Sequence, residues 1–350
     1  MTIKIDGTNG IVLPNGTAAL PSTTGADTHT GISYGNNTLT LSTGGVTAMT
    51  IDAGQNVTFN NSPTNGMRNR IINGNMDVAQ RGSTFTDGNG YTLDRWYGNR
   101  AGAVAGVTYA QVYGAFGTNT NGLYIQRTIG NTSTAAAALY QAIEGINSRD
   151  LAGKTITVSF QVGSGSISST TGHSVYVFYQ TTTTDIGPAS GAWTALTAQS
   201  FTVASSSSYT QKTFQFSIPP TATQLQLNIQ FAFSGTAGAD DRFYLTQVQL
   251  EAGAVASSFE RRMYGTELAL CQRYYEICQF TASVSTPITY PGNQYKVSKR
   301  TAATLTFVGT NNGQTFFDYF GVAGPYGQSF RQLTNPTTAT DCTIYANAEL

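Results

Sequence analysis

Apolar and polar residues alternate along the middle of the chain with the two-residue period of β-strands. The alternation is strict from Thr223 to Phe233, where large apolar residues fall on one face and amides on the other, namely Gln224, Gln226, Asn228 and Gln230. Between Arg242 and Leu250 the apolar positions shift by one residue, which predicts a β-bulge near Thr246–Gln247. Further strands are expected at Gly122–Ile129, Thr155–Val162, Ser174–Gln180 and Thr213–Ile218. About eight half-buried strands within residues 65–262 predict a two-sheet β-sandwich of the jelly-roll type, so the fold class is all-β.

Residues 1–64 are rich in Gly, Asn and Thr and contain few large apolar residues. Short strands are expected there at Thr38–Ser42, Val46–Ile51 and Asn56–Phe59. One copy of this segment cannot bury enough surface to fold alone. Two interpretations stay open: a flexible tail, or a thin β-structured anchor that becomes ordered by pairing with copies of itself or with a docking partner.

Residues 263–350 begin with a segment that has a helical period, and the pattern predicts a helix from a cap at Thr266 through Cys278. Four residues in it follow spacings of three, four and three, which is typical of a coiled-coil seam: Leu268, Cys271, Tyr275 and Cys278. A second apolar stripe lies on another face, so the helix must be covered on two sides. The four seam residues are therefore predicted to form a trimer interface near a threefold axis. The strands expected after the helix form a small β-module: Ala303–Val308, Thr315–Phe320 and Cys342–Tyr345.

Composition narrows the class of protein. The 350 residues carry 18 Lys and Arg against 18 Asp and Glu, and charged residues make up 10% of the chain. A neutral chain with so few charges has no electrostatic footprint for nucleic acid or an anionic membrane. The sequence shows neither a signal peptide nor an apolar run near the ~20 residues of a spanning helix. Three cysteines cannot build a disulfide framework. We expect a protein made in the cytoplasm with the composition of one displayed outside.

The chain offers little material for catalysis. A catalytic histidine would have to be His29 or His173, and no nucleophile motif stands near either. Glycan cleavage needs two carboxylates about 5 to 9.5 Å apart, and the pair Asp240–Asp241 lies in a Gly- and Ala-rich turn where both side chains are expected to be solvated. Cys271 and Cys278 fit a helix core better than a zinc site. We therefore expect no enzyme activity, no metal and no cofactor.

Recognition of sugars fits the composition better. The chain has 19 Tyr, 18 Phe and 2 Trp among many Asn, Gln, Ser and Thr residues. Sugar-binding surfaces combine aromatic rings with amides and hydroxyls, because a pyranose has an apolar face and a hydroxyl rim. The alternative for each ring is a place in the core or wall of the sandwich. The candidates chosen for glycan binding are Tyr179, Trp193, Tyr319 and Tyr326.

Two signatures resemble the opening and the close of a β-sandwich module in bacteriophage tail-fibre and head-fibre proteins. The opening signature comprises Asn69–Gly82 and Tyr91–Trp96. The closing signature comprises Val248–Gly253, Ser257–Arg262 and Glu267–Tyr275. Together they bracket well over half of the chain. The segment from Ile5 to Thr17 is similar to the virion-anchoring tips of such fibres.

The resemblance implies a homotrimeric appendage on the virion surface. Such a protein attaches through its N-terminus to another virion protein of the tail or head, and it binds host-cell-surface glycan through a carbohydrate-binding-type jelly roll and a distal tip. Three functions stay open: a receptor-binding tail fibre, a head or neck decoration fibre with a structural role, and a glycan-degrading tailspike. The shortage of candidate catalytic residues disfavours the last.

The charged residues of the two signatures are expected to be structural. Asp94 and Arg95 are predicted to form an internal carboxylate–guanidinium pair beside a buried Trp96. The charges of Glu260–Arg261–Arg262, just before the helix, are predicted to form salt bridges at the junction between the sandwich and the C-terminal region.

Overall fold

The computed structural model describes most of the chain, namely residues 4–6, 10–53, 57–59, 62–63, 67–86, 89–100, 106–166, 168–204, 206–282, 292–308, 310–311, 314–315, 317–319, 325–332 and 340–349. Two compact units are present. One comprises residues 1–68 with 251–255, and the other comprises residues 69–250 with 256–350. Each unit is described by itself.

The N-terminal unit is built from short antiparallel strands. A hairpin, β1 (Lys4–Asp6) and β2 (Gly10–Val12), comes before a six-stranded meander made of β3 (Thr23–Thr24), β4 (Gly31–Gly35), β5 (Thr38–Thr43), β6 (Val46–Ile51), β7 (Val57–Phe59) and β8 (Ser62–Pro63). Two-residue hairpin turns favour positive φ. Asn37 provides it between β4 and β5, and Gly44–Gly45 provides it between β5 and β6. The strands expected at Thr38–Ser42 and Val46–Ile51 are confirmed, and the one expected at Asn56–Phe59 is confirmed for its described residues, Val57–Phe59.

The large apolar residues of this meander share one face. Ile32 pairs with Leu41 and Leu41 pairs with Met49, while Tyr34 pairs with Leu39 and Leu39 pairs with Ile51. Residues directly opposite each other in a ladder point to the same side. These side chains stay partly exposed, with Tyr34 at 39% and Leu41 at 36%. The unit therefore has an apolar sheet face, which we call the N-terminal apolar face.

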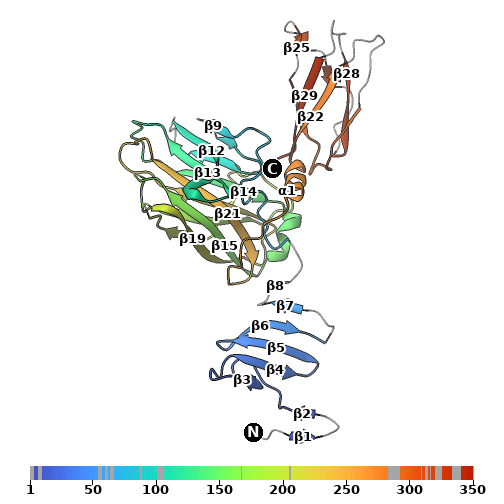
Figure 1. The fold of residues 1–350 in the computed structure, drawn as a ribbon. Helices are drawn as coiled ribbons and strands as arrows, with labels where there is room; N and C mark the ends of the chain where they lie inside the picture. Colours follow the sequence, from blue (N-terminus) through green and yellow to red (C-terminus); the bar gives the residue numbers. More distant parts are fainter. Residues whose placement is uncertain are drawn as a thin grey trace. The chain divides into compact units, whose positions relative to one another are not determined.

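The second unit contains the predicted sandwich, which is confirmed (Figure 1). Sheet I has the order β10 (Gly90–Tyr91), β11 (Tyr97–Arg100), β14 (Ala137–Ile143), β20 (Gln224–Phe231), β16 (His173–Gln180) and β17 (Thr194–Ala195), with β18 (Gln199–Phe201) also paired to β16. Sheet II has the order β19 (Ser206–Ser217), β15 (Thr155–Ser164), β21 (Arg242–Ala252), β13 (Asn121–Arg127), β12 (Val107–Tyr113) and β9 (Thr84–Thr86). In the described part of this unit, the 3₁₀ helix η1 (Ala115–Gly117) lies between β12 and β13 of sheet II, whereas η2 (Gly145–Asn147) and η3 (Arg149–Leu151) lie between β14 of sheet I and β15 of sheet II.

Aromatic rings join the two sheets in the core. Phe231 of sheet I stacks on Phe243 of sheet II with ring centroids 5.0 Å apart, and Phe201 of sheet I contacts Phe160 of sheet II at 5.4 Å. The predicted bulge is present, because Gln247 has a φ of +52° and the buried positions shift from Leu245 to Val248. The inward face of β20 is confirmed as apolar, but its amide face is also buried, with Gln226 only 2% exposed.

The described residues of the C-terminal region form one α-helix and three small sheets. Helix α1 (Tyr264–Gln272) comes before β22 (Tyr275–Ala282), which pairs with β29 (Thr340–Asn347), and β29 also pairs with β24 (Thr304–Val308). The remaining strands are β23 (Gly292–Gln294), β28 (Gly327–Gln332), β27 (Phe317–Tyr319), β25 (Thr310–Asn311) and β26 (Gln314–Thr315). No helix in the described part of the chain combines the length and the apolar character needed to span a membrane.

The predicted helical seam is wrong, because the helix ends at Gln272. Leu268 and Cys271 lie on α1, whereas Tyr275 and Cys278 lie on β22, so the four residues do not share a helix face. Lys299 Nζ donates a hydrogen bond to the Gln272 carbonyl oxygen at 2.5 Å and forms an ion pair with Glu276 at 2.5 Å. The β22–β29 ladder then takes over the backbone hydrogen bonds from Tyr275 onward. Cys271 and Cys278 are buried within the chain. Trimer formation itself stays a prediction.

Candidate functional site

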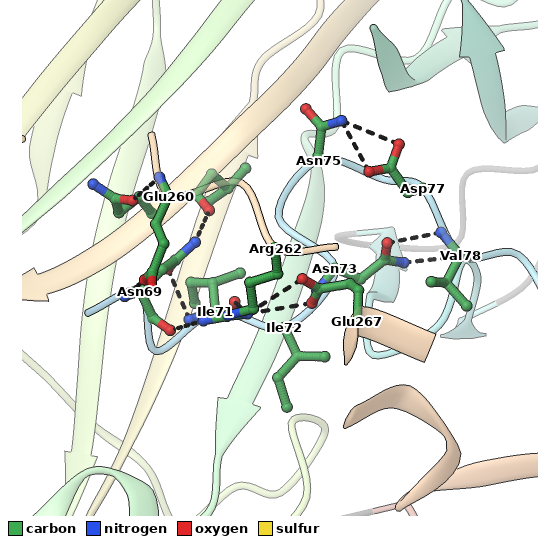
Figure 2. Close-up of polar contacts among 12 residues, drawn as sticks. Asn69, Ile71, Ile72, Asn73, Asn75, Asp77, Val78, Glu260, Arg262 and Glu267 are labelled. Carbon is green, nitrogen blue, oxygen red and sulfur yellow. Dashed lines mark hydrogen bonds and ion pairs between the residues drawn. The ribbon is translucent and has the colours of Figure 1, made fainter. Parts of the chain in front are cut away.

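The opening and closing signatures contact each other at one end of the sandwich (Figure 2). The Asn69 N–H donates to Glu260 Oε2 at 2.6 Å, and the Asn73 N–H donates to Glu267 Oε1 at 2.5 Å. Arg262 forms an ion pair with Glu267 at 3.3 Å and also donates to the Asn69 carbonyl oxygen. Junction salt bridges are therefore confirmed for Arg262. Arg261, in contrast, forms no ion pair with the residues that the structure describes.

The predicted pairing of Asp94 with Arg95 is wrong. Asp94 accepts hydrogen bonds from the Gln80 N–H and Nε2, each at 2.6 Å. Arg95 instead forms an ion pair with Glu349 near the end of the chain. Arg95 has a φ of +70° within a tight turn, so the two neighbouring side chains diverge. The expectation of a buried Trp96 is confirmed. These charges hold the C-terminal region against the sandwich.

Asp240 and Asp241 also diverge. Asp240 accepts a hydrogen bond from the Ser166 N–H at 2.7 Å. The expectation that both are solvated is wrong for Asp241, which is 1% exposed and lies 2.5 Å from Nε of the buried Arg127. Arg127 ends β13 and Asp241 comes directly before β21. The two side chains meet because β13 and β21 pair with each other in sheet II. Asp241 is therefore a structural counter-ion.

His173 is a core histidine. Its Nδ1 accepts a hydrogen bond from the Ala232 N–H at 3.1 Å, so the ring proton lies on Nε2, which is 3.1 Å from the Ser169 carbonyl oxygen. The ring lies 4.8 Å from the Phe243 ring and 5.3 Å from the Phe201 ring. Burial lowers the pKa of His173, which favours the neutral imidazole. Both nitrogens are already engaged, so neither is available for a substrate.

The structure describes the side chains of three of the four residues chosen for glycan binding, and they lie in different surroundings. Tyr179 pairs with Leu225 of the core, so it lies on the inward side of sheet I, and Trp193 is half-buried with its indole N–H donating to the Gly187 carbonyl oxygen at 2.9 Å. Tyr326 is 76% exposed in the C-terminal region. Tyr319 lies in β27, and its side chain is outside the described part of the chain.

The outer face of sheet I carries a different set of aromatic residues. Successive ladder partners form one row across β10, β11, β14, β20 and β16: Tyr91, Tyr97, Tyr140, Asn228 and Tyr176. Tyr97 stacks on Tyr140 with centroids 6.3 Å apart and an interplanar angle of 13°. With neighbouring strands about 4.8 Å apart, the row extends over about 19 Å. We call this surface the tyrosine row.

A second row beside the tyrosine row also combines an aromatic ring with an amide. Ala142 pairs with Gln226, and Gln226 pairs with Phe178, which stacks on Tyr176 at 5.8 Å. All the residues of these two rows are uncharged. The aromatic side chains of Tyr97, Tyr140, Tyr176 and Phe178 are half-buried. Such a surface offers ring faces for stacking and amides for hydrogen bonds.

Two amide oxygens between these rings lack partners among the described residues. Gln226 Oε1 and Asn228 Oδ1 are buried and accept no hydrogen bond there. The Asn228 amide lies against the hydroxyl of Tyr140, whose pKa is raised by burial. An unsatisfied buried acceptor costs about 1–3 kcal/mol, and buried polar groups are normally satisfied. The two oxygens are therefore unsatisfied acceptors beneath the ring surface, and a hydroxyl donor can reach them only if a neighbouring side chain moves aside.

Part of this surface could be found from the sequence. The strict alternation of β20 already separates Asn228 and Gln226 from the core positions, and the same parity in β16 groups Tyr176 with Phe178. Tyr97 and Tyr140 carry no such signal. They join the row only because β11 pairs with β14, and this pairing brings together residues about 40 positions apart in sequence.

Among known proteins, similarity to this chain is found in solved structures. No family model matches the chain, and no curated protein matches it. Among solved structures, one described as "a putative sugar binding protein from Bacteroides thetaiotaomicron VPI-5482" has a TM-score of 0.37 and 13% identity, covering 53% of this chain and 99% of that one. A structure described as "CBM4 structure and function" has a TM-score of 0.35 and 21% identity, covering 52% of this chain and 99% of that one.

A virion protein also appears among the solved structures. The enzymatically active domain of tailspike protein 4 of bacteriophage CBA120 has a TM-score of 0.35 and 14% identity. The similarity covers 53% of this chain and 21% of that one, so this chain spans about a fifth of the tailspike domain. All three likenesses are distant, so a function for this chain has to be inferred from its own residues in sheet I and in the N-terminal apolar face.

Proposed function

We propose that this protein is a binding, non-catalytic fibre of a bacteriophage virion whose jelly-roll sandwich binds a neutral host-surface glycan through the tyrosine row. The protein is a homotrimer that attaches to another virion protein of the tail or head through its N-terminal unit. The observation that carries the binding role is the pair of unsatisfied amide oxygens, on Gln226 and Asn228, between half-buried aromatic rings.

The chemistry of the row matches a neutral sugar. Aromatic rings such as Tyr140 and Tyr176 stack on the apolar face of a pyranose, while its hydroxyls donate to Gln226 Oε1 and Asn228 Oδ1. The rows contain no charged side chain that would select an acidic ligand. The row extends across five strands, so it accommodates several linked sugars rather than one. A linear glycan that crosses the strands is the ligand that fits this arrangement.

Tyr140→Ala is expected to weaken glycan binding at least tenfold, which corresponds to about 1.4 kcal/mol. The matched control is Tyr113→Ala, which removes a 68% exposed tyrosine from β12 of the opposite sheet. Glycan-array screening identifies the ligand, and titration calorimetry measures its affinity. Wild-type protein added to host cells before the particle should block adsorption, and the Tyr140→Ala variant should not.

Asn228→Leu separates binding from folding. Removing the unsatisfied acceptor offsets the loss of the contact between the Asn228 amide and the Tyr140 hydroxyl, so stability should change little, whereas glycan binding should fall as it does for Tyr140→Ala. Equal affinity of both variants and wild type would overturn the tyrosine row as the site. Absence of adsorption block by a folded wild-type protein would favour the head or neck decoration fibre. Release of reducing sugar from the bound glycan would favour a tailspike.

Trimer formation has support in the N-terminal unit. Ile32, Leu39, Leu41, Met49 and Ile51 lie on one side of a single sheet and remain partly exposed. Burial of such a face by equivalent faces of two more copies gives a closed cyclic oligomer. The same pairing explains how a segment with so few apolar residues becomes ordered.

Leu41→Asp is expected to convert the trimer to a species of one-third the molar mass, because the charge falls at the centre of the apolar face. Light scattering on purified protein measures the mass. Thr40→Asp places the same charge on the other side of β5 and should leave the trimer intact. Wild-type protein that is monomeric, or a Leu41→Asp variant that remains trimeric, would contradict this interface.

A further inference from the structure

A cavity lies on the outer face of sheet II, on the side of the sandwich away from the tyrosine row. Its volume is about 420 Å³. Side chains from β15, β19 and the bulge of β21 line it together with the segments around residues 119 and 260, and those with polar or aromatic groups include Asn119, Gln161, Tyr209, Gln247, Phe259 and Arg261. On β15 the core residues Phe160 and Val162 point inward, so Gln161 points outward.

Local backbone geometry creates the hollow. The bulged Gln247, with a φ of +52°, interrupts the regular surface of β21. Gly122 leaves room for Tyr209, because a Cβ at that position would lie 2.8 Å from the Tyr209 hydroxyl oxygen. Phe116, with a φ of +56°, packs edge-on against the Tyr209 ring at 5.0 Å. The chain therefore fixes the Tyr209 ring beside the cavity.

The Tyr209 hydroxyl is buried and has no hydrogen-bond partner among the described residues. Burial, with a further contribution from Tyr244, raises the pKa of Tyr209 to about 12. The hydroxyl therefore keeps its proton and is available as a donor at neutral pH. An unpaired buried donor beside a cavity is a feature that a bound acceptor would satisfy.

The cavity lining contains one charged side chain, that of Arg261. This side chain is exposed and forms no ion pair in the described ranges of the chain. The neighbouring carboxylates are held by other donors and do not pair with Arg261: Glu260 accepts a hydrogen bond from the Asn69 N–H, and Asp77 accepts from Asn75 and Asn121. A guanidinium without a counter-ion favours a carboxylate, which it can bind with two parallel hydrogen bonds.

We infer that this cavity binds a carboxylated sugar of the hexuronic acid class, at a site separate from the neutral-glycan row. Arg261 binds the carboxylate, and the Tyr209 hydroxyl donates to an oxygen of the same ligand. The Phe259 ring faces the apolar side of the pyranose, while the amides of Asn119, Gln161 and Gln247 bind its hydroxyls. The inference is independent of the proposed function, because none of these residues belongs to the tyrosine row.

The test is an NMR titration of the full-length protein with D-glucuronate, D-glucose and acetate. Glucuronate should bind, whereas glucose and acetate should each bind at least tenfold more weakly, because each lacks one half of the recognised chemistry. Arg261→Gln should weaken glucuronate binding at least tenfold, Arg261→Lys should weaken it less, and Tyr209→Phe should weaken it several-fold. Arg261→Lys keeps a positive charge and Tyr209→Phe removes only the hydroxyl, so these two variants separate the charge and the hydroxyl from the bulk of the side chains.

Two control variants distinguish binding in this cavity from nonspecific attraction of an anion to a positive charge. Lys212→Gln removes a positive charge from the same strand as Tyr209, outside the cavity, and should leave glucuronate binding unchanged. Tyr140→Ala should also leave it unchanged, so failure of the tyrosine row and failure of this site give different results. Equal binding of acetate, an equal loss in Lys212→Gln, or no binding of glucuronate by folded protein would each overturn the inference.

Discussion

Replacing Glu349 with glutamine is expected to lower the free energy of unfolding by about 3–5 kcal/mol, because it leaves buried charge without a counter-ion. The Glu349 carboxylate forms ion pairs with Arg95, which is 2% exposed, and with Arg81 at 3.0 Å. Arg95 also lies 3.5 Å from the centroid of the Tyr274 ring and donates to the Ala142 carbonyl oxygen at 2.6 Å. Its guanidinium cannot move into solvent without breaking these contacts.

Asp150→Asn is the matched control for this prediction. Asp150 forms an ion pair with Arg70 at 2.7 Å, but its side chain is 49% exposed, so its loss should cost less than about 1 kcal/mol. Urea unfolding followed by fluorescence measures both, since Trp96 is fully buried in the sandwich. A loss for Glu349→Gln no larger than that of Asp150→Asn would contradict the role of the buried ion pair.

Arg127→Met is expected to cost about 3–5 kcal/mol for a related reason. Arg127 is fully buried, and its guanidinium binds Asp241 and the carbonyl oxygens of Ser133, Ser234 and Gly235 at 2.5 to 3.0 Å. Removing the guanidinium leaves one carboxylate and three carbonyl oxygens without donors. The same urea titration measures the effect on the sandwich.

A second variant tests the cause of that loss. Arg127→Met combined with Asp241→Leu removes both charges, so it should be less destabilised than Arg127→Met alone. Arg149→Met removes an exposed arginine and should change stability by less than about 1 kcal/mol. A double variant that is at least as unstable as the single one would show that packing, rather than unpaired charge, sets the cost.

The β-sandwich can be predicted because its signal is local. Strict alternation in β20 and the one-residue shift in β21 depend only on which neighbouring residues are apolar, and both features appear in the structure. The depth of burial of Gln226 and Asn228 cannot be predicted in this way, because it depends on Tyr140, Tyr176 and Phe178 of the flanking strands. The alternation predicts a polar face, and the structure shows a polar face lined by aromatic rings.

The error at the helix end has a physical cause. From Leu268 to Cys278 the apolar residues satisfy a helical period, but a short apolar run is also compatible with a strand. Segments distant in sequence determine that the helix ends and a strand begins. β29 pairs with β22 from Tyr275 onward, and Lys299 donates a hydrogen bond to the Gln272 carbonyl oxygen at the helix end. The sequence of the helix itself contains neither partner.

The pairing of charged residues is the least predictable feature. Asp94 and Arg95 are adjacent in the chain, yet Arg95 pairs with Glu349, 254 positions away. Few charges are present in the chain, and the fold rather than sequence proximity decides which partner a buried one finds. Tyr97 and Tyr140 of the tyrosine row cannot be predicted for the same reason, because they join the row only through pairing between strands.

The contact between Asn69 and Glu260 has a consequence for how such proteins diversify. These residues are 191 positions apart in sequence and hydrogen-bonded in space, so the chain enters and leaves the sandwich at one point. Everything between them behaves as a cassette with adjoining ends. Recombination that exchanges this segment between related genes would replace the whole sandwich at once and leave the flanking segments in register.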